Sequence, residues 1–187
     1  MPPWIIVLII IAVIVAFVFI YIVATYNSLV GLKNKVSDQW SQIDVELKRR
    51  FDLIPNFVST VKGYAKHESE TLEKVIAARN SYMNAENKEE AMNADNVLTS
   101  TLTKLFALTE SYPDLKANEN FLELQKELSE TENKISYARK FYNDSAYQLN
   151  NKIDMFPSNI VAKMFNFKKV EFFKAQEAER ENVKVEF

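Results

Sequence analysis

The sequence contains no cysteine, one histidine (His67) and only two glycines among its 187 residues. Without cysteine the chain has neither disulfides nor thiolate metal sites, although this alone does not distinguish the cytoplasm from the periplasm. A single histidine leaves any zinc site to carboxylates, and the E-x-x-H pairs of di-iron bundles are missing. Scarce glycine, with only five prolines, favours long helices over strands and hairpins. The composition therefore predicts an all-α protein without a metal or other cofactor.

Motifs that carry catalysis are also missing. The sequence has no G-x-S-x-G nucleophile elbow, no phosphate-binding P-loop and no Ser/His pairing in a suggestive context. The 23 basic and 25 acidic side chains nearly cancel, which gives a formal net charge of -2. No basic face for nucleic acid is indicated. We expect neither an enzyme nor a nucleic-acid-binding protein.

Residues 4–24, which follow a short tail of residues 1–3, contain no charged side chain. At about 1.5 Å per residue, a helix of about twenty residues crosses a hydrocarbon core about 30 Å thick. A secretory signal peptide is the alternative, but its apolar core is typically about 7–15 residues and is preceded by basic residues. Here Met1-Pro2-Pro3 supplies no Lys or Arg, and no clear cleavage site follows. We predict a transmembrane helix, with Trp4, Tyr21 and Tyr26 in the interfacial aromatic belts.

The orientation of this span is predicted from the basic residues beside it. Lys33 and Lys35 follow within about 15 residues, and Lys48, Arg49 and Arg50 lie slightly beyond. Because Lys and Arg near a span favour the cytoplasmic side, we expect the N-terminus outside and the remaining chain in the cytoplasm.

A helical stripe of apolar residues continues from the span through Pro55. A proline inside a helix removes one backbone hydrogen bond and clashes with the preceding turn, which bends the helix at a cost of about 3 kcal/mol. Because the stripe keeps its phase across Pro55, we predict one bent helix. The alternative is two helices, with Asp52 as the N-cap of the second. The stripe consists of Leu29, Leu32, Val36, Trp40, Ile43, Leu47, Phe51, Ile54, Val58, Val61 and Ala65.

Three more amphipathic helices are predicted after Gly63. The first is capped by His67 or Ser69 and extends to Met83, the second covers about 91–108, and the third runs from about 118 to 153. Four long helices with short connections predict an antiparallel up-down four-helix bundle with coiled-coil-like packing over residues 25–156. Residues 157–187 are predicted to form an irregular tail with a short helix at about 159–165 and apolar anchors.

Several short motifs are distributed over nearly the whole chain, most densely between Leu47 and Glu68. They are Tyr26-Asn27, Trp40, Ile43-Asp44, Leu47-Lys48-Arg49-Arg50, Asp52-Leu53-Ile54-Pro55-Asn56, Val61-Lys62-Gly63-Tyr64, His67-Glu68, Leu72, Ala78-Arg79, Phe156-Pro157-Ser158-Asn159 and Val185-Glu186-Phe187. In these motifs the chain resembles the LemA family. The resemblance implies a bacterial membrane protein with one N-terminal span and an antiparallel helical bundle. It also implies a role other than catalysis, since one branch of the family serves in magnetosome membrane formation and other members accompany a membrane metalloprotease.

Arg50 is the first candidate site, because it lies at the edge of the apolar stripe between Leu47 and Ile54. A buried guanidinium needs a partner, for which Glu68 or Glu73 on a neighbouring helix, or Asp52 and Asn56 nearby, are candidates. The group would either fix the register of the helices or recognise a partner protein. Pro55, Tyr64 and His67 belong to the same block of motifs, and His67-Glu68 also suits a simple helix start.

The C-terminus is the second candidate. Val185-Glu186-Phe187 has the apolar-x-apolar form that strand-adding grooves of the PDZ type accept. The alternative is that Phe172, Phe173 and Phe187 cover the end of the bundle.

Taken together, the patterns predict a membrane-anchored, non-enzymatic interaction or scaffolding module at the inner membrane of a bacterium. Its expected neighbours are the lipid bilayer, a protein partner such as a membrane metalloprotease, and other copies of itself. The alternatives are an adaptor for a membrane protease or quality-control complex, and a sensor that binds a small ligand between its helices.

Overall fold

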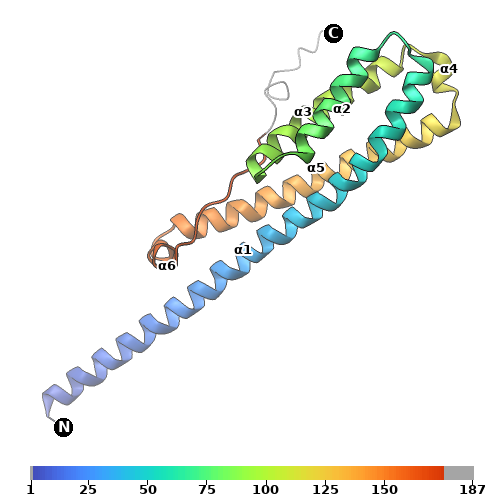
Figure 1. The fold of residues 1–187 in the computed structure, drawn as a ribbon. Coiled ribbons are helices and arrows are strands. Elements are labelled where there is room, and N and C mark those ends of the chain that lie inside the picture. The colour runs from blue at the N-terminus through green and yellow to red at the C-terminus, as the bar shows by residue number, and fades with distance from the viewer. Residues whose placement is uncertain (1, 175–187) are drawn as a thin grey trace, which may run out of the picture. The chain divides into compact units, whose positions relative to one another are not determined.

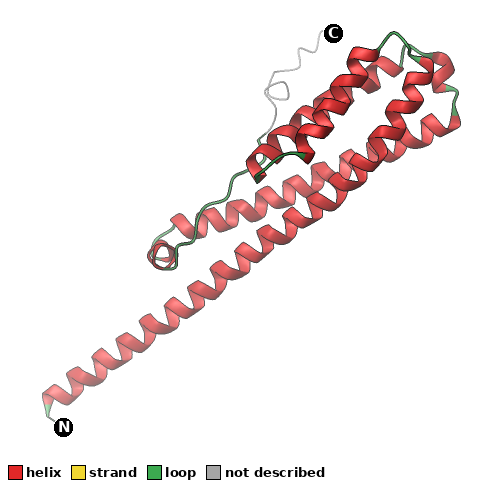
Figure 2. Ribbon diagram, viewed as in Figure 1, coloured by secondary structure: helices red, strands yellow, loops and turns green. Residues whose placement is uncertain are grey.

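A computed structural model describes residues 2–174, and its regular structure within that range consists of six helices and no strand (Figure 2). The prediction of an all-α protein is confirmed. Of the described residues, 2–40 and 141–172 form one compact unit (unit 1), and 41–140 with 173–174 form a second (unit 2). The helices labelled in Figure 1 are α1 (Pro3–Tyr64), α2 (Ser69–Met83), α3 (Lys88–Thr109), α4 (Pro113–Lys116), α5 (Glu119–Asp154) and α6 (Ser158–Met164).

The first part of α1 is an exposed apolar rod. Its most apolar window has a mean hydropathy of 3.6, and none of that window is buried. The large hydrophobic side chains that are exposed between Trp4 and Val23 have 40–71% of their surface accessible. Such a surface is strongly unfavourable in water, at about 25 cal/mol per Å² of apolar area. The N-terminal helix is therefore long and apolar enough to cross a membrane.

Helix α1 continues without interruption through Pro55. The prediction of one helix is confirmed, and the alternative of a second helix capped by Asp52 is wrong. Most of the predicted stripe is buried, whereas Leu32 and Val58 are half-buried. Phe57, outside the predicted stripe, is also fully buried.

Unit 2 contains the end of α1, then α2, α3, α4 and the beginning of α5. Its core includes three aromatic rings: Phe57 lies 5.4 Å from Phe106 and 5.3 Å from Phe121, between ring centroids. Helix α5 begins at Glu119, close to the predicted start near residue 118. The side chain of Asn118 caps this end, because it accepts a hydrogen bond from the Phe121 amide at 2.9 Å. The antiparallel up-down order of these segments, and the boundaries at residues 4–24, 25–156 and 157–187, stay predictions.

Two details of unit 2 differ from the predictions. The N-cap residue of α2 is Glu68, without a side-chain capping bond, so neither His67 nor Ser69 has that role. Helix α4 was not predicted, because four residues are too few for a helical period to be visible. Its first residue, Pro113, suits a helix start, and its Leu115 is fully buried.

Unit 1 contains the first part of α1, the end of α5, helix α6 and the segment that follows it. Leu29 of α1, Leu149 of α5 and Val161 of α6 are buried. Trp40 packs edge-on against Tyr142, with 5.6 Å between ring centroids. Helix α6 confirms the short helix predicted near residues 159–165.

Candidate functional site

Arg50 is the centre of a buried charged cluster in unit 2, which we call the Arg50 cluster: Arg50, Asp95, Thr99, Glu132 and Arg139. The Arg50 side chain is fully buried. Its Nη2 pairs with Oδ1 of Asp95, and its Nη1 donates to Glu132 Oε1 at 2.6 Å and to Thr99 Oγ1 at 3.1 Å. One guanidinium thus joins side chains from α1, α3 and α5.

The charges in the Arg50 cluster balance. Asp95, also fully buried, pairs through its second oxygen with Arg139, which is 20% exposed, and Glu132 is 21% exposed. Two arginines therefore face two carboxylates. A buried ion pair offsets its desolvation only when such partners and hydrogen bonds are present, so each member depends on the others.

Burial alone lowers the pKa of the Arg50 guanidinium, since desolvation disfavours its charged form. The negative charges of Asp95 and Glu132, with the hydrogen bonds that they accept, outweigh burial, and the pKa of Arg50 is raised above its ordinary value. Arg50 therefore stays charged at every pH that the folded protein meets.

The predicted partners of Arg50 are wrong. With about 100° of rotation per residue in a helix, Asp52 and Asn56 point about 160° and 120° away from Arg50, so neither can reach the same face. Both are exposed. The partners come from α3 and α5, rather than from Glu68 or Glu73 of the segment around α2.

A second interhelical contact explains how α1 accommodates Pro55. Proline has no amide hydrogen, so the carbonyl of Phe51, four residues earlier, loses its usual helical donor. Arg79 of α2 donates its Nε to this carbonyl at 3.1 Å. The role of the Arg79 guanidinium, which satisfies the backbone of another helix, was not predicted from the sequence.

Of the other predicted residues of this region, Tyr64 ends α1 and Glu68 precedes α2, whereas Pro55 lies within α1 and His67 in the turn between the two helices. Asn118 donates its Nδ2 to the Tyr64 hydroxyl at 3.0 Å, and Tyr112 donates its hydroxyl to Glu68 at 3.0 Å. Pro55 and His67 are exposed. The structure thus does not gather Asp52, Pro55, Asn56, Tyr64, His67 and Glu68 into one site with Arg50.

Phe172 and Phe173, the two predicted anchors of the tail that the structure describes, differ from one another. Phe173 is buried in unit 2, and the Arg139 guanidinium lies 5.2 Å from the centre of its ring. Phe172 is 38% exposed. Val185 and Phe187 lie outside the described residues, so the hypothesis of a C-terminal docking motif stays a prediction.

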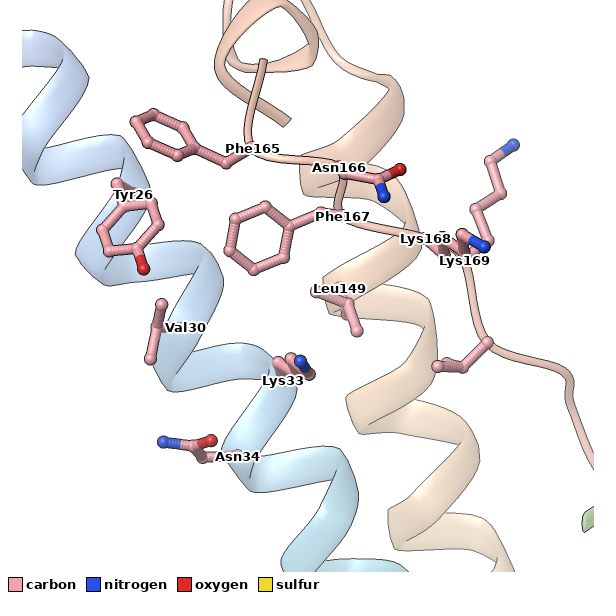
Figure 3. A pocket seen from close by; sticks show the side chains of 11 residues that line it. Tyr26, Val30, Lys33, Asn34, Leu149, Phe165, Asn166, Phe167, Lys168 and Lys169 are labelled. Atoms are coloured by element: carbon pink, nitrogen blue, oxygen red, sulfur yellow. The ribbon is translucent and has the colours of Figure 1, made fainter. Parts of the chain in front are cut away.

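Unit 1 contains a pocket of about 610 Å³ between α1, α5 and the segment after α6 (Figure 3). Tyr26 lies at one side of it, with its ring centroid 4.6 Å from that of Phe165 and 5.9 Å from that of Phe167. The polar part of the lining consists of Lys33, Asn34, Asn166, Lys168 and Lys169. The pocket therefore combines an aromatic wall with amide and ammonium groups.

The turn that follows α6 shapes this pocket. Asn166 has a φ of 56°, the left-handed conformation that asparagine tolerates better than most residues. The amide of Phe167 donates to the Ala162 carbonyl at 2.9 Å, and that of Asn166 to the Lys163 carbonyl at 3.2 Å. These two bonds form a Schellman motif, which reverses the chain and directs Phe167 back toward α1 (Figure 3).

The returning segment is tied to α5 by neutral hydrogen bonds. The Asn150 side chain donates to the Val170 carbonyl at 2.9 Å and accepts from the Val170 amide at 3.0 Å. The Tyr142 hydroxyl donates to the Glu171 carbonyl at 3.0 Å. The pocket wall is therefore held by backbone contacts at two places.

Within residues 2–174, no group of three or more His, Asp or Glu side chains is placed to hold a metal ion. Asp95, Glu132 and the interhelical role of Arg139 were not predicted from the sequence. The burial of Asp95 could have been predicted, since this residue occupies a position in the apolar stripe of its own helix, between Ala91 and Leu98. An acidic residue at a core position, with an opposite charge at a core position elsewhere, is the pattern to look for.

Comparison with known proteins identifies the family. The model of the LemA family matches residues 39–187. The chain belongs to the LemA family. It is 32% identical to Protein LemA of Metamycoplasma hominis over 168 residues, which cover 89% of this chain and 76% of that protein.

More distant relatives of this LemA family chain are magnetosome proteins. It is 24% identical over 179 residues to Magnetosome protein MamQ 2 of Paramagnetospirillum magneticum, covering 82% of this chain and 66% of the relative. Magnetosome protein MamQ of Magnetospirillum gryphiswaldense is 23% identical over 174 residues, covering 79% and 64%. The chain thus spans about two thirds of the magnetosome relatives. The family and the exposed apolar helix together indicate a membrane-associated protein.

Proposed function

We propose that this LemA family protein is a membrane-anchored helical module that holds partner proteins close to the bilayer without catalysing a reaction. The observation that carries the proposal is the continuity of α1, which runs from the apolar span into the buried cores of both compact units. Because the part of α1 in unit 1 is one unbroken helix, the position of the span fixes how far from the bilayer the side chains of that part lie. An anchored chain also meets its partners and its own copies in two dimensions, at high effective concentration.

The proposal includes an arrangement and an orientation. We infer an antiparallel up-down bundle for the four long segments of unit 2, supported by the short connections 65–68 and 84–87. We also infer that the chain beyond the span faces the cytoplasm of a bacterial cell, supported by Lys33 and Lys35 after the span. Protease digestion of spheroplasts tests the orientation, since digestion from outside would reverse it.

The positional mechanism is tested by loosening α1 beside the membrane. A flexible Gly/Ser insertion after Ala24 separates the span from Thr25, the first buried residue of unit 1. We expect the melting temperature of the purified protein to stay unchanged, while crosslinking mass spectrometry in native membranes shows fewer links to partner proteins. An unchanged set of crosslinks would rule out the positional mechanism.

The matched control is an alanine-rich insertion at the same place. Seven residues add about two helical turns, so the helix stays continuous and keeps its phase within about 20°. We expect this variant to retain the crosslinks that the flexible insertion loses. If both insertions lose them equally, the distance from the bilayer matters and not the stiffness of α1.

An adaptor for a membrane protease is the second hypothesis, and it concerns the C-terminus. Removal of Val185-Glu186-Phe187 should abolish co-purification with the protease and leave the melting temperature unchanged. A large fall in melting temperature would instead support packing of these residues against the helices.

A further inference from the structure

Helix α6 has a buried face and an exposed apolar face. Ser158, Val161 and Ala162 are buried. Several large apolar side chains in the helix and directly beside it are exposed, among them Phe156 by 80%, Ile160 by 58%, Met164 by 58% and Phe165 by 46%. We call these four residues the α6 apolar face. A group of large apolar side chains on one short segment marks a surface that is covered by something apolar.

The α6 apolar face lies beside the end of the membrane span. The Phe165 ring packs on Tyr26 at 4.6 Å between centroids, and Tyr26 is only two residues beyond Ala24, where the apolar run of α1 ends. Two residues correspond to about 3 Å along a helix. Phe165 is therefore at the depth of the lipid headgroups whenever α1 crosses a bilayer.

The pocket next to this face has the groups that bind a phosphate. Lys33, Lys168 and Lys169 supply ammonium groups, and Asn34 and Asn166 supply amide donors. Within residues 2–174, Asp154 forms an ion pair with Lys169 at 2.7 Å, and both side chains are more than half exposed. Lys33 and Lys168 are the other two lysines of the lining.

The distances agree with a site at the membrane surface. Lys33 lies nine residues beyond Ala24, about 13 Å along the helix, and the headgroup layer extends about 5–8 Å beyond the hydrocarbon. Helical side chains tilt toward the N-terminus, and a lysine side chain spans about 6 Å, so the side chain of Lys33 is long enough for its ammonium to reach the headgroup layer.

We infer that the α6 apolar face is inserted in the interface of the bilayer that α1 spans, and that the adjacent pocket binds the phosphate of an anionic phospholipid. Aromatic and aliphatic side chains enter the boundary between headgroups and acyl chains, while lysines contact the phosphates. The inference rests on the membrane anchor and needs no protein partner.

Insertion is tested by spin labels on the full chain reconstituted in lipid vesicles. The chain has no cysteine, so Ile160→Cys gives a single labelling site. We expect the label to collide with oxygen, which concentrates in lipid, and to be shielded from a water-soluble nickel chelate. The matched control is Val97→Cys on α3, which is 55% exposed in the absence of lipid, and its label should show the reverse.

If the label at Ile160→Cys is as accessible to nickel as the one at Val97→Cys, the inference is overturned. Met164→Cys provides a second position on the same face, in case the first variant does not fold. An unchanged melting temperature in detergent identifies the variants that fold.

Phosphate binding is tested with spin-labelled phosphatidylglycerol and phosphatidylcholine in mixed vesicles. We expect the protein to immobilise the anionic lipid preferentially, and the Lys33→Gln/Lys168→Gln variant to lose that preference. The control variant Lys62→Gln/Lys104→Gln, which changes two exposed lysines of unit 2, should keep it.

The source of the phosphate is decided by competition with excess inorganic phosphate at constant ionic strength. Preference for phosphatidylglycerol that persists supports a lipid site, whereas its complete loss shows a site for free phosphate and overturns the inference. Equal immobilisation of both lipids by the unmodified protein also overturns it. These measurements use purified protein and lipid alone, so they fail or succeed independently of the proposed scaffolding function.

Discussion

The two compact units bury polar groups of different kinds. Unit 2 buries the charges of Arg50 and Asp95 among its core side chains, whereas the buried polar residues of unit 1 within residues 2–174 are the uncharged Thr25, Ser145, Asn150 and Ser158. In unit 2 the polar groups of different helices bind one another. In unit 1 the side chains of Tyr142 and Asn150 bind backbone groups of the returning segment.

This difference separates two ways of fixing a helical structure. A charge that must meet a particular partner on another helix penalises every wrong register, so the Arg50 cluster specifies how α1, α3 and α5 align. A neutral amide bound to backbone loses less when it is exposed to water. Unit 1 is therefore the part in which local opening is less costly, and it contains the segment that we place at the lipid surface.

Removal of the buried carboxylate of Asp95 should have the largest effect. Asp95→Ala leaves the Arg50 guanidinium with one carboxylate, and breaking a buried pair in this way costs about 3–5 kcal/mol. Chemical denaturation in detergent measures the free energy of unfolding. Val97→Ala, two residues along α3 at an exposed position, is the control and should change it by less than about 0.5 kcal/mol.

A charge swap sharpens this prediction. Because Glu132 faces Arg50 and Arg139 faces Asp95, the swap is made at all four positions, as Arg50→Glu/Asp95→Lys/Glu132→Lys/Arg139→Glu, and it should recover part of the stability that Asp95→Ala loses. A loss for Asp95→Ala below about 1 kcal/mol would mean that the cluster behaves like a surface ion pair.

The corresponding change in unit 1 is Asn150→Ala, which removes both hydrogen bonds to Val170. We expect a loss of about 1–3 kcal/mol, confined to the segment 165–172. Hydrogen exchange should become faster there and stay unchanged in α3. The exposed Gln148 of the same helix is the control, and faster exchange throughout the chain after Asn150→Ala would contradict a local role.

The contact between Arg79 and Phe51 is best tested by a double-mutant cycle. Arg79→Met leaves the Phe51 carbonyl without its donor, which should cost about 1 kcal/mol. In the background of Pro55→Ala the new amide can donate to that carbonyl, so the same change should cost less. Additive effects of the two substitutions would show that Arg79 does not compensate for the proline.

The fold followed largely from the sequence, because long periodic stripes report helices directly. The apolar stripe of α1 keeps one helical phase through Pro55, and this correctly favoured one continuous helix over a turn at Asp52. The partners of Arg50 could not be found in the same way, since a stripe shows which face is buried but not which helix covers it. Helix α4 was too short to show a period.

The pocket in unit 1 was also beyond sequence reasoning. It depends on the left-handed conformation of Asn166 and on the return of Phe167 toward Tyr26, and neither leaves a periodic pattern. The exposure of the α6 apolar face could not be predicted either, because the sequence pattern of its apolar residues is equally consistent with buried anchors that pack the tail against the helices.

Alkaline pH should give the smallest effect. Burial, and then the nearby charge of Glu171, raise the pKa of Tyr142. A tyrosine with a raised pKa in the folded state contributes stability that is complete below about pH 10 and is lost as the pH rises through the folded-state pKa. We expect the free energy of unfolding to fall by less than about 1 kcal/mol between about pH 9 and pH 11 on this account.

Tyr142→Phe should reduce this alkaline fall. It should not abolish the fall, because burial and the charge of Asp44 also raise the pKa of Tyr82. Thermal melting at a series of pH values measures both, and an unchanged slope in Tyr142→Phe would remove Tyr142 as a cause.

The contact between Arg79 and Phe51 also orders events during synthesis. The chain leaves the ribosome from its N-terminus, so Pro55 emerges more than twenty residues before Arg79 does. During that interval the Phe51 carbonyl has water as its only donor, and the turn around Pro55 is the weakest part of α1. The Phe51 carbonyl therefore gains its protein donor only when α2 arrives, although α1 is translated first.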